Sequence, residues 1–189
     1  MVDSYRYSFT IPNIITLLRL MCAPLVIWLV LEDHLVAAFW VFILAGISDG
    51  VDGFIAKTFD LRSLLGAYID PLADKALLVS IYVSLGLKGY IPDWLVILVV
   101  FRDAVIVGGL ILEHMLRDHV VMKPLLISKA NTLLQITLAG FVLAKLGGYI
   151  DAGVWLSVLI YMVAATTLAS GALYVWNGLM GIDKAGGPV

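Results

Sequence analysis

Six apolar runs, each about the length of a membrane span, follow one another along the chain and are separated by short polar connections. They cover Ile14–Leu31, Leu35–Ala56, Leu65–Leu87, Trp94–Leu116, Ile127–Leu146 and Val154–Leu179. A helix of about 20 apolar residues can cross a hydrocarbon core about 30 Å thick. The pattern therefore predicts an all-α integral membrane protein, a six-transmembrane-helix bundle with a short N-terminal interfacial segment. No connection leaves room for a soluble domain, so residues 1–189 are expected to form one membrane domain.

The composition agrees with this interpretation and excludes several classes of function. Of 189 residues, 62% are hydrophobic and 14% are charged, and the mean hydropathy is +1.03, far from a typical soluble domain. A net charge of −2 offers no basic surface for nucleic acid. The single cysteine, Cys22, has no intrachain disulfide partner. The histidines, which are His34, His114 and His119, lack the spacing of metal ligands.

Lysine and arginine predict the orientation in the membrane. With a cytoplasmic N-terminus, the connections on the inside carry Arg6, Lys57, Arg62, Arg117, Lys123, Lys129 and Lys184, against Lys88 and Lys145 outside. This bias follows the positive-inside rule. Trp28, Trp40, Trp94 and Trp155 fall near the outer helix ends, as an aromatic belt would. The polar leader is too short and too poor in Arg for an organelle transit peptide, so we expect a bacterial inner membrane.

Four aspartates interrupt this apolar pattern where the second run ends and the third begins. They are Asp49, Asp52, Asp70 and Asp74. Ionised groups are costly in such segments and mark functional sites. Steps of three and four residues place each pair on one face of its helix. Facing carboxylate pairs repel unless cations lie between them, so the spacing predicts a divalent metal site that opens toward the cytoplasm.

The third run raises a structural alternative, because Asp70 precedes Pro71 and such a pair can cap a helix. A cap explains only one of the aspartates. Leu64 and Leu65 also indicate that this helix starts earlier. A proline-bent helix with Asp70 on the inside of the bend is the favoured interpretation.

Small and polar residues in the first two helices extend the candidate site. Asn13, Thr16 and Arg19 recur every three residues and share a face that is expected to point into the bundle. This stripe is either interhelical glue or the wall of a site. Gly46, Gly50 and Gly53 form a stripe that favours close helix packing, or the approach of a pyrophosphate or base.

The later helices carry fewer signals. Arg102 is expected to face the polar cavity or to bond another helix, and adjacent side chains on a helix point about 100° apart, which argues against Arg102 and Asp103 as a facing pair. Lys129 can snorkel to the membrane interface, whereas the further polar residues Asn131, Thr132 and Gln135 suggest a second wall of the same cavity. The last helix, with Thr166, Thr167, Ser170 and Asn177, is expected only to close the bundle.

Paired carboxylates on a membrane hairpin match the protein half of a two-metal site, where ions about 4 Å apart clamp a phosphoryl group. Four aspartates without His or Cys suit Mg²⁺ or Mn²⁺. The order of Asp49, Asp52, Gly53, Ala56, Lys57, Gly66, Asp70 and Asp74 resembles the signature of the CDP-alcohol phosphotransferases. Family members usually have Arg at the position of Lys57, and a lysine lacks the planar fork for bidentate contacts.

This resemblance implies an enzyme that displaces CMP from a CDP-linked lipid by an alcohol. It implies that Asp49, Asp52, Asp70 and Asp74 bind the metals, that Asp74 is also the general base, and that the family's homodimers are expected here. Gly53, Ala56, Lys57 and Gly66 would bind the nucleotide. The acceptor or its phosphate would meet Arg102, Lys123, Lys129, Asn13 and Arg19.

Other stretches narrow the acceptor. TIPNIITLLRL, GAYIDPLADKALLVSIYVSL, FRDAVI and KPLLISKANTLLQ are more similar to cardiolipin synthases of the mitochondrial type than to phosphatidylglycerophosphate synthases. The resemblance implies transfer from CDP-diacylglycerol to phosphatidylglycerol, giving cardiolipin and CMP. Glycerol 3-phosphate as acceptor, another CDP-alcohol phosphotransferase activity, and cation transport are the alternatives. Transport is the remote one, because transport sites usually lie near the midplane between repeats.

Overall fold

The computed structural model describes residues 11–58, 64–116, 126–151 and 153–180, and side chains within 17–48, 75–109, 126–151 and 153–176. All regular secondary structure in this part of the chain is α-helical, and short turns join the helices. The helices are α1 (Ile11–Leu31), α2 (Leu35–Thr58), α3 (Leu64–Leu87), α4 (Asp93–Leu116), α5 (Leu126–Leu146) and α6 (Gly153–Met180). Each coincides with one expected apolar run to within three residues at either end.

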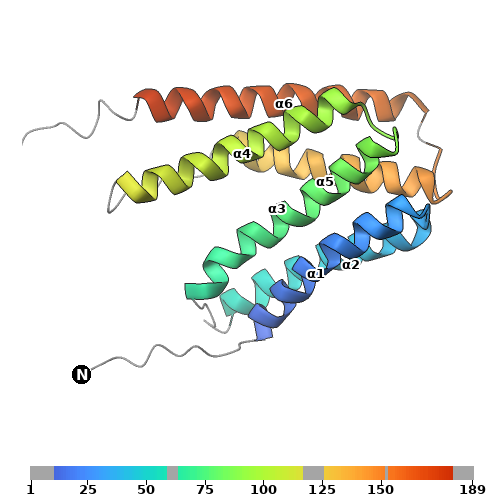
Figure 1. The fold of residues 1–189 in the computed structure, drawn as a ribbon, viewed down its shortest axis with the longest axis horizontal. Coiled ribbons are helices and arrows are strands. Elements are labelled where there is room, and N and C mark those ends of the chain that lie inside the picture. The colour runs from blue at the N-terminus through green and yellow to red at the C-terminus, as the bar shows by residue number, and fades with distance from the viewer. Residues whose placement is uncertain (1–10, 59–63, 117–125, 152, 181–189) are drawn as a thin grey trace, which may run out of the picture.

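The helices pack side by side in an order that differs from their order in the chain (Figure 1). Contacts link α1 to α2, α2 to α5, α5 to α6, α6 to α4, α4 to α3, and α3 back to α1, which closes a ring. Helices α3 and α5 also touch each other. This arrangement places α3, which carries Asp70 and Asp74, beside both α4 and α5.

Three helices that end on the same side of the bundle end in the same way. Asp33 after α1, Gly89 after α3 and Gly148 after α5 all adopt positive φ, at 58°, 72° and 78°. The next residue donates its backbone N–H to the carbonyl oxygen five positions back, as His34 does to Leu29 at 2.8 Å. This is the Schellman arrangement, which satisfies helix-end carbonyls. Asp33 takes a position that glycine usually fills.

The connections on this side are tied together by side chains. Lys88 Nζ donates to Oδ2 of Asp33 at 2.8 Å and to the carbonyl oxygen of Leu31 at 3.0 Å. Trp40 Nε1 donates to the Tyr149 hydroxyl at 2.8 Å. Together these bonds link α1 to the α3–α4 connection and α2 to the α5–α6 connection.

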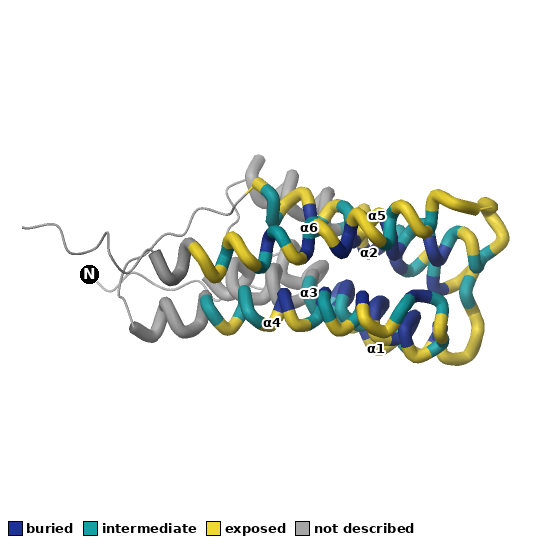
Figure 2. Tube along the Cα trace, turned by 90° about the horizontal axis from the view of Figure 1, so that it is seen from above, coloured by how far each residue is buried: buried dark blue, intermediate teal, exposed yellow. Residues whose placement is uncertain are grey.

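The described helices carry both buried and exposed residues (Figure 2), and large apolar side chains occur in both groups. The fully buried ones include Val26, Val30, Ile81, Tyr82, Leu85, Leu95, Val99, Leu138, Leu143 and Val163. Large apolar side chains are also exposed, and all four tryptophans of the expected aromatic belt are among them. An apolar outer surface of this extent is typical of a protein that contacts lipid or a partner.

Within the described residues, two helical segments are long and apolar enough to cross a membrane, Leu126–Leu146 and Gly153–Trp176. Shorter apolar stretches cover Leu17–Leu31, Leu35–Ser48 and Lys75–Leu87. The all-α architecture with six helices is thus confirmed, whereas the six-span interpretation stays a prediction.

Among the described residues, close approach of helices occurs at Gly86 and not at Gly46. A Cβ atom on Gly46 would meet nothing within 4 Å, so the expectation of close packing is wrong there. A Cβ atom on Gly86 would lie 2.7 Å from Cγ2 of Val96, because α3 and α4 meet at this glycine. The surroundings of Gly50 and Gly53 lie outside what the structure describes.

Candidate active site

The four aspartates lie on two consecutive helices, in the segments that the sequence predicted. Asp49 and Asp52 belong to the last three turns of α2, and Asp70 and Asp74 belong to α3. Because α3 already begins at Leu64, the alternative in which Asp70 caps a helix that starts at Pro71 is wrong. The side chains of these aspartates lie outside the described residues.

Several other expected site residues also fall outside the part of the chain that the structure describes. The side chains of Asn13, Gly53, Ala56, Lys57 and Gly66 belong to this group, and so does Lys123 as a whole. The donor set by itself fits a divalent metal. Four carboxylates supply only oxygen ligands, which is the type that Mg²⁺ and Mn²⁺ prefer.

The side chains of α3 are described from Lys75 onward, which is one residue after Asp74. Lys75 Nζ donates to Oδ1 of Asp103 on α4 at 2.6 Å. The Asp103 side chain is 5% exposed and that of Lys75 is 26% exposed. Lys75, next to the aspartate signature, is therefore bound by a buried carboxylate that lies on another helix, 28 residues further along the chain.

The same carboxylate oxygen also binds its chain neighbour. Arg102 Nη1 donates to Oδ1 of Asp103 at 2.8 Å, and the arginine is 3% exposed. The expectation that these adjacent residues do not pair is therefore wrong. Their Cβ atoms point apart along the helix, but the long arginine side chain lets its guanidinium return to the aspartate.

The other end of the guanidinium connects two further helices. Arg102 Nη2 donates to the hydroxyls of Ser128 on α5 and Ser170 on α6, both at 2.6 Å. The sequence allowed Arg102 to bond another helix, and the structure shows such bonds to two helices, α5 and α6. Nε of Arg102 and Oδ2 of Asp103 are buried and have no hydrogen-bond partner among the described residues.

Polar residues of α5 divide between the interior and the surface. Asn131 and Gln135 are 0% exposed, whereas Lys129 is exposed. Asn131 Oδ1 accepts hydrogen bonds from the hydroxyls of Thr166 at 2.8 Å and Thr167 at 2.9 Å. The exposure of Lys129 agrees with the snorkelling that the sequence predicted, and the second wall formed by Asn131, Thr132 and Gln135 stays a prediction. Helix α6 does more than close the bundle, because its hydroxyls bond to α4 and α5.

Buried amide atoms that have no hydrogen-bond partner among the described side chains continue this interior line. They are Nδ2 of Asn131 and both side-chain atoms Oε1 and Nε2 of Gln135. Arg19 of α1 is also buried, at 3% exposure, so this member of the predicted stripe lies inside the bundle as expected. The sequence separated Lys129 from the other polar residues of α5, but it did not show that Thr132 lies in a surface pocket while Asn131 and Gln135 are buried.

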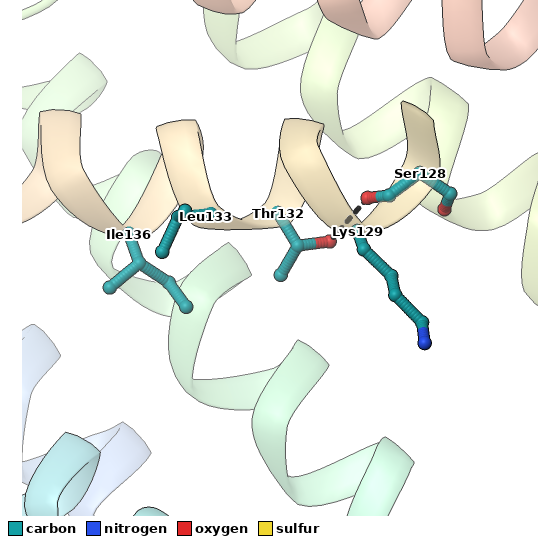
Figure 3. Close-up of a pocket in the computed structure, with 5 residues that line it drawn as sticks. All are labelled: Ser128, Lys129, Thr132, Leu133 and Ile136. Carbon is teal, nitrogen blue, oxygen red and sulfur yellow. Dashed lines mark hydrogen bonds between the residues drawn. The ribbon is translucent and has the colours of Figure 1, made fainter. Parts of the chain in front are cut away.

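An open pocket of about 360 Å³ follows the other face of α5 (Figure 3). Its lining residues are Ser128, Lys129, Thr132, Leu133 and Ile136. The first three give it a polar end, where Thr132 donates to the carbonyl oxygen of Ser128 at 3.1 Å. Leu133 and Ile136 make the other end apolar. Through Ser128 the pocket wall touches the Arg102 guanidinium.

Comparison with known proteins settles the family. The family model described as CDP-alcohol phosphatidyltransferase matches residues 9–170, which include the aspartate signature and all helices up to the middle of α6. The chain belongs to the CDP-alcohol phosphatidyltransferase family. The resemblance of the aspartate spacing to that family is thereby confirmed.

Similar members of the CDP-alcohol phosphatidyltransferase family carry two kinds of name. The chain is 38% identical over 184 residues to the cardiolipin synthase (CMP-forming) / mitochondrial hydrolase fusion protein of Schizosaccharomyces pombe, covering 88% of this chain and 30% of that protein. It is 34% identical over 191 residues to human cardiolipin synthase (CMP-forming), covering 92% and 63%. A rice protein, CDP-diacylglycerol–glycerol-3-phosphate 3-phosphatidyltransferase 1, chloroplastic, is 33% identical over 180 residues, covering 85% and 54%. The chain spans less than two thirds of the length of each of these relatives.

Proposed function

We propose that this chain transfers a phosphatidyl group from CDP-diacylglycerol to a hydroxyl of phosphatidylglycerol, giving cardiolipin and CMP. Family membership and the similarity to cardiolipin synthases (CMP-forming) carry this proposal. In the reaction, the acceptor hydroxyl oxygen forms a bond to the phosphatidyl phosphorus. The bond from that phosphorus to the oxygen of CMP breaks, and the hydroxyl proton leaves to a base.

Residues of the α2–α3 hairpin are assigned to the donor. Asp49, Asp52, Asp70 and Asp74 would hold Mg²⁺ or Mn²⁺, and the bound ions would neutralise the pyrophosphate and the departing CMP. Asp74 would accept the proton, because a carboxylate in hydrogen-bond reach of the attacking hydroxyl is a suitable base. Gly53, Ala56, Lys57 and Gly66 would surround the nucleotide.

The pocket on α5 supports a lipid as the acceptor. Lys129, at its polar end, can bind a phosphate by a charge-assisted hydrogen bond. Leu133 and Ile136 are exposed apolar side chains at the other end, where an acyl chain would replace water or bulk lipid. A headgroup and the start of its chains would lie along this open pocket of about 360 Å³. Glycerol 3-phosphate has no apolar part to fill this end.

Other acceptor contacts follow from charge and position. Lys123 would supply a second cation beside the phosphate, and Asn13 and Arg19 would approach from α1. Arg102 keeps its Nε for a polar ligand, since its Nη atoms already bind Asp103, Ser128 and Ser170. We assign it a smaller part in phosphate binding than Lys129.

Orientation and assembly belong to the same proposal. All six helices would span a bacterial inner membrane, with the N-terminus and the aspartate hairpin on the cytoplasmic side. The exposed tryptophans Trp28, Trp40, Trp94 and Trp155 support this, because amphipathic rings favour the membrane interface. A homodimer is proposed from the resemblance to the family.

A direct assay compares the two acceptors. Purified protein in detergent with CDP-diacylglycerol and Mg²⁺ or Mn²⁺ is given phosphatidylglycerol or glycerol 3-phosphate in parallel, and CMP and lipid products are identified by mass. We expect CMP and cardiolipin with the first acceptor only. Phosphatidylglycerophosphate from the second acceptor would instead support the alternative that the rice relative represents.

A further inference from the structure

Asp103 is the centre of a polar network that ends beside the aspartate signature. Its Oδ1 atom accepts from Lys75 Nζ at 2.6 Å and from Arg102 Nη1 at 2.8 Å. Lys75 directly follows Asp74 in α3. The network therefore reaches the polypeptide segment that carries Asp70 and Asp74, although it starts on α4.

The network is anchored before it reaches α3. Arg102 bonds Ser128 on α5 and Ser170 on α6, each at 2.6 Å, and both Arg102 and Asp103 are less than 5% exposed. A buried, doubly bonded carboxylate has little freedom to move. Lys75 is thus bound to a carboxylate, Asp103, whose position is fixed by contacts among α4, α5 and α6.

Net stability is a poor explanation for this arrangement. Removing two charges from water costs about as much as their attraction returns, and apolar replacements are often neutral or stabilising. What a short charged hydrogen bond does provide is direction, because it fixes the donor in one place. The element fixed here is the turn of α3 at Lys75, next to the proposed metal ligands.

We propose that Asp103 is a positioning residue of the metal site: through Lys75 it holds the α3 segment on which Asp74 lies. This inference rests on the metal binding that is part of the proposed function. Groups that orient metal ligands without touching the metal typically change affinity or activity about 10-fold to 100-fold when they are replaced.

Binding of Mn²⁺ to the purified protein, measured by electron paramagnetic resonance without substrates, tests the inference apart from catalysis. We expect Asp103→Asn to weaken Mn²⁺ binding by about 10-fold or more. Asp33→Asn is the matched control, because it also removes a carboxylate that binds a lysine. Its partner is Lys88, and both residues lie in connections between helices, away from the four aspartates. Asp33→Asn should leave Mn²⁺ binding unchanged. Unchanged binding in a helical, folded Asp103→Asn protein would overturn the inference.

Lys75→Met provides a second route should Asp103→Asn fail to fold. It should weaken Mn²⁺ binding to the same extent, and the double variant should be no worse than either single one, since the two residues act as a unit. Additive losses would contradict this. Weakened Mn²⁺ binding in both variants supports the inference even if the wild-type protein makes no cardiolipin. Failure of the wild-type protein to bind Mn²⁺ would overturn the inference and the metal assignment together.

Discussion

Lys75 Nζ lies 2.6 Å from Oδ1 of Asp103, and this contact joins the end of the aspartate signature on α3 to the middle of α4. Asp103 also binds Arg102, which continues to Ser128 and Ser170. Lys75 of α3 and the α5 pocket are therefore connected by a chain of three polar bonds. Ser128 belongs both to this chain and to the pocket wall.

The proposed base gives the first prediction. Asp74→Asn should lower CMP release by about a hundredfold or more, because an amide neither accepts the proton nor binds a divalent ion well. CMP release from CDP-diacylglycerol and phosphatidylglycerol measures the effect. Circular dichroism should match that of the wild-type protein, and unchanged turnover in the folded variant would refute the assignment.

The polar end of the α5 pocket gives the second prediction. Lys129→Met should raise the KM for phosphatidylglycerol about tenfold, since a hydrogen bond to a charged group contributes about 1.5 to 3 kcal/mol. The KM for CDP-diacylglycerol should change little. Lys145→Met is the control, because Lys145 is also exposed on α5 but lies in its last turn. Equal effects of the two variants would argue against an acceptor site at Lys129.

The guanidinium network predicts a loss of stability. Arg102→Met removes three side-chain bonds at once and should destabilise the protein by about 3 kcal/mol, the cost of breaking a buried charge pair. Arg102→Lys should recover little, because a point charge cannot bind Asp103 on one side and two serines on the other. Heat denaturation in detergent measures both. A lysine variant as stable as the wild type would show that the fork geometry is unimportant.

The Asp33 side chain predicts a pH dependence. Hydrogen bonds from Lys88 and then Tyr90 lower the pKa of Asp33 below its ordinary value of 3.8. A group whose pKa is lowered by folding stabilises the protein above the ordinary pKa, and this contribution disappears as the pH falls through the folded pKa. The wild type should lose thermal stability below about pH 4 more steeply than Asp33→Asn.

Asparagine suits this comparison because it tolerates the positive φ of 58° at Asp33. Lys88 behaves in the opposite sense, since its hydrogen bond to Asp33 raises its pKa. Its contribution is present below its ordinary pKa and is lost only as the pH rises through the higher folded value. At pH values between the folded pKa of Asp33 and that of Lys88, the wild type and Asp33→Asn should show a constant difference in denaturation midpoint. Parallel curves down to pH 3 would contradict the role of Asp33.

Two glycines predict opposite effects of the same substitution. Gly86→Ala would place a methyl group 2.7 Å from Cγ2 of Val96, whose β-branched side chain has few alternative rotamers. We expect destabilisation of about 1 to 3 kcal/mol from overpacking between α3 and α4. Gly46→Ala meets nothing within 4 Å and should stabilise α2 by about 0.5 to 1 kcal/mol. Heat denaturation in detergent should separate them, and equal midpoints would refute the close approach at Gly86.

Helix bounds could be predicted closely because apolar run length depends only on neighbouring residues. Every helix starts and ends within three residues of its predicted run. The start of α3 at Leu64, before Asp70, followed from Leu64 and Leu65 alone. The local pattern did not reveal that Asp33 would take the helix-ending position that glycine takes at Gly89 and Gly148.

Partners of polar side chains could not be predicted in the same way. The facing of Arg102 was expected from its place in an apolar run, but its bonds to Ser128 and Ser170 depend on α5 and α6 lying beside α4. The angle argument against Arg102 and Asp103 failed, because it considered Cβ directions and ignored the length of the arginine. The polar segment of α5 faces two ways, which only the rotation of the packed helix decides.

The sequence by itself determined the six helices, the family and the set of four carboxylates, because hydrophobic run length and short spacings are local properties. Only the tertiary structure decided that Lys75 meets Asp103 and that Ser128 joins the network to the α5 pocket. These contacts link residues far apart in the chain. They depend on the order in which helices pack and on side-chain reach, neither of which a linear pattern contains.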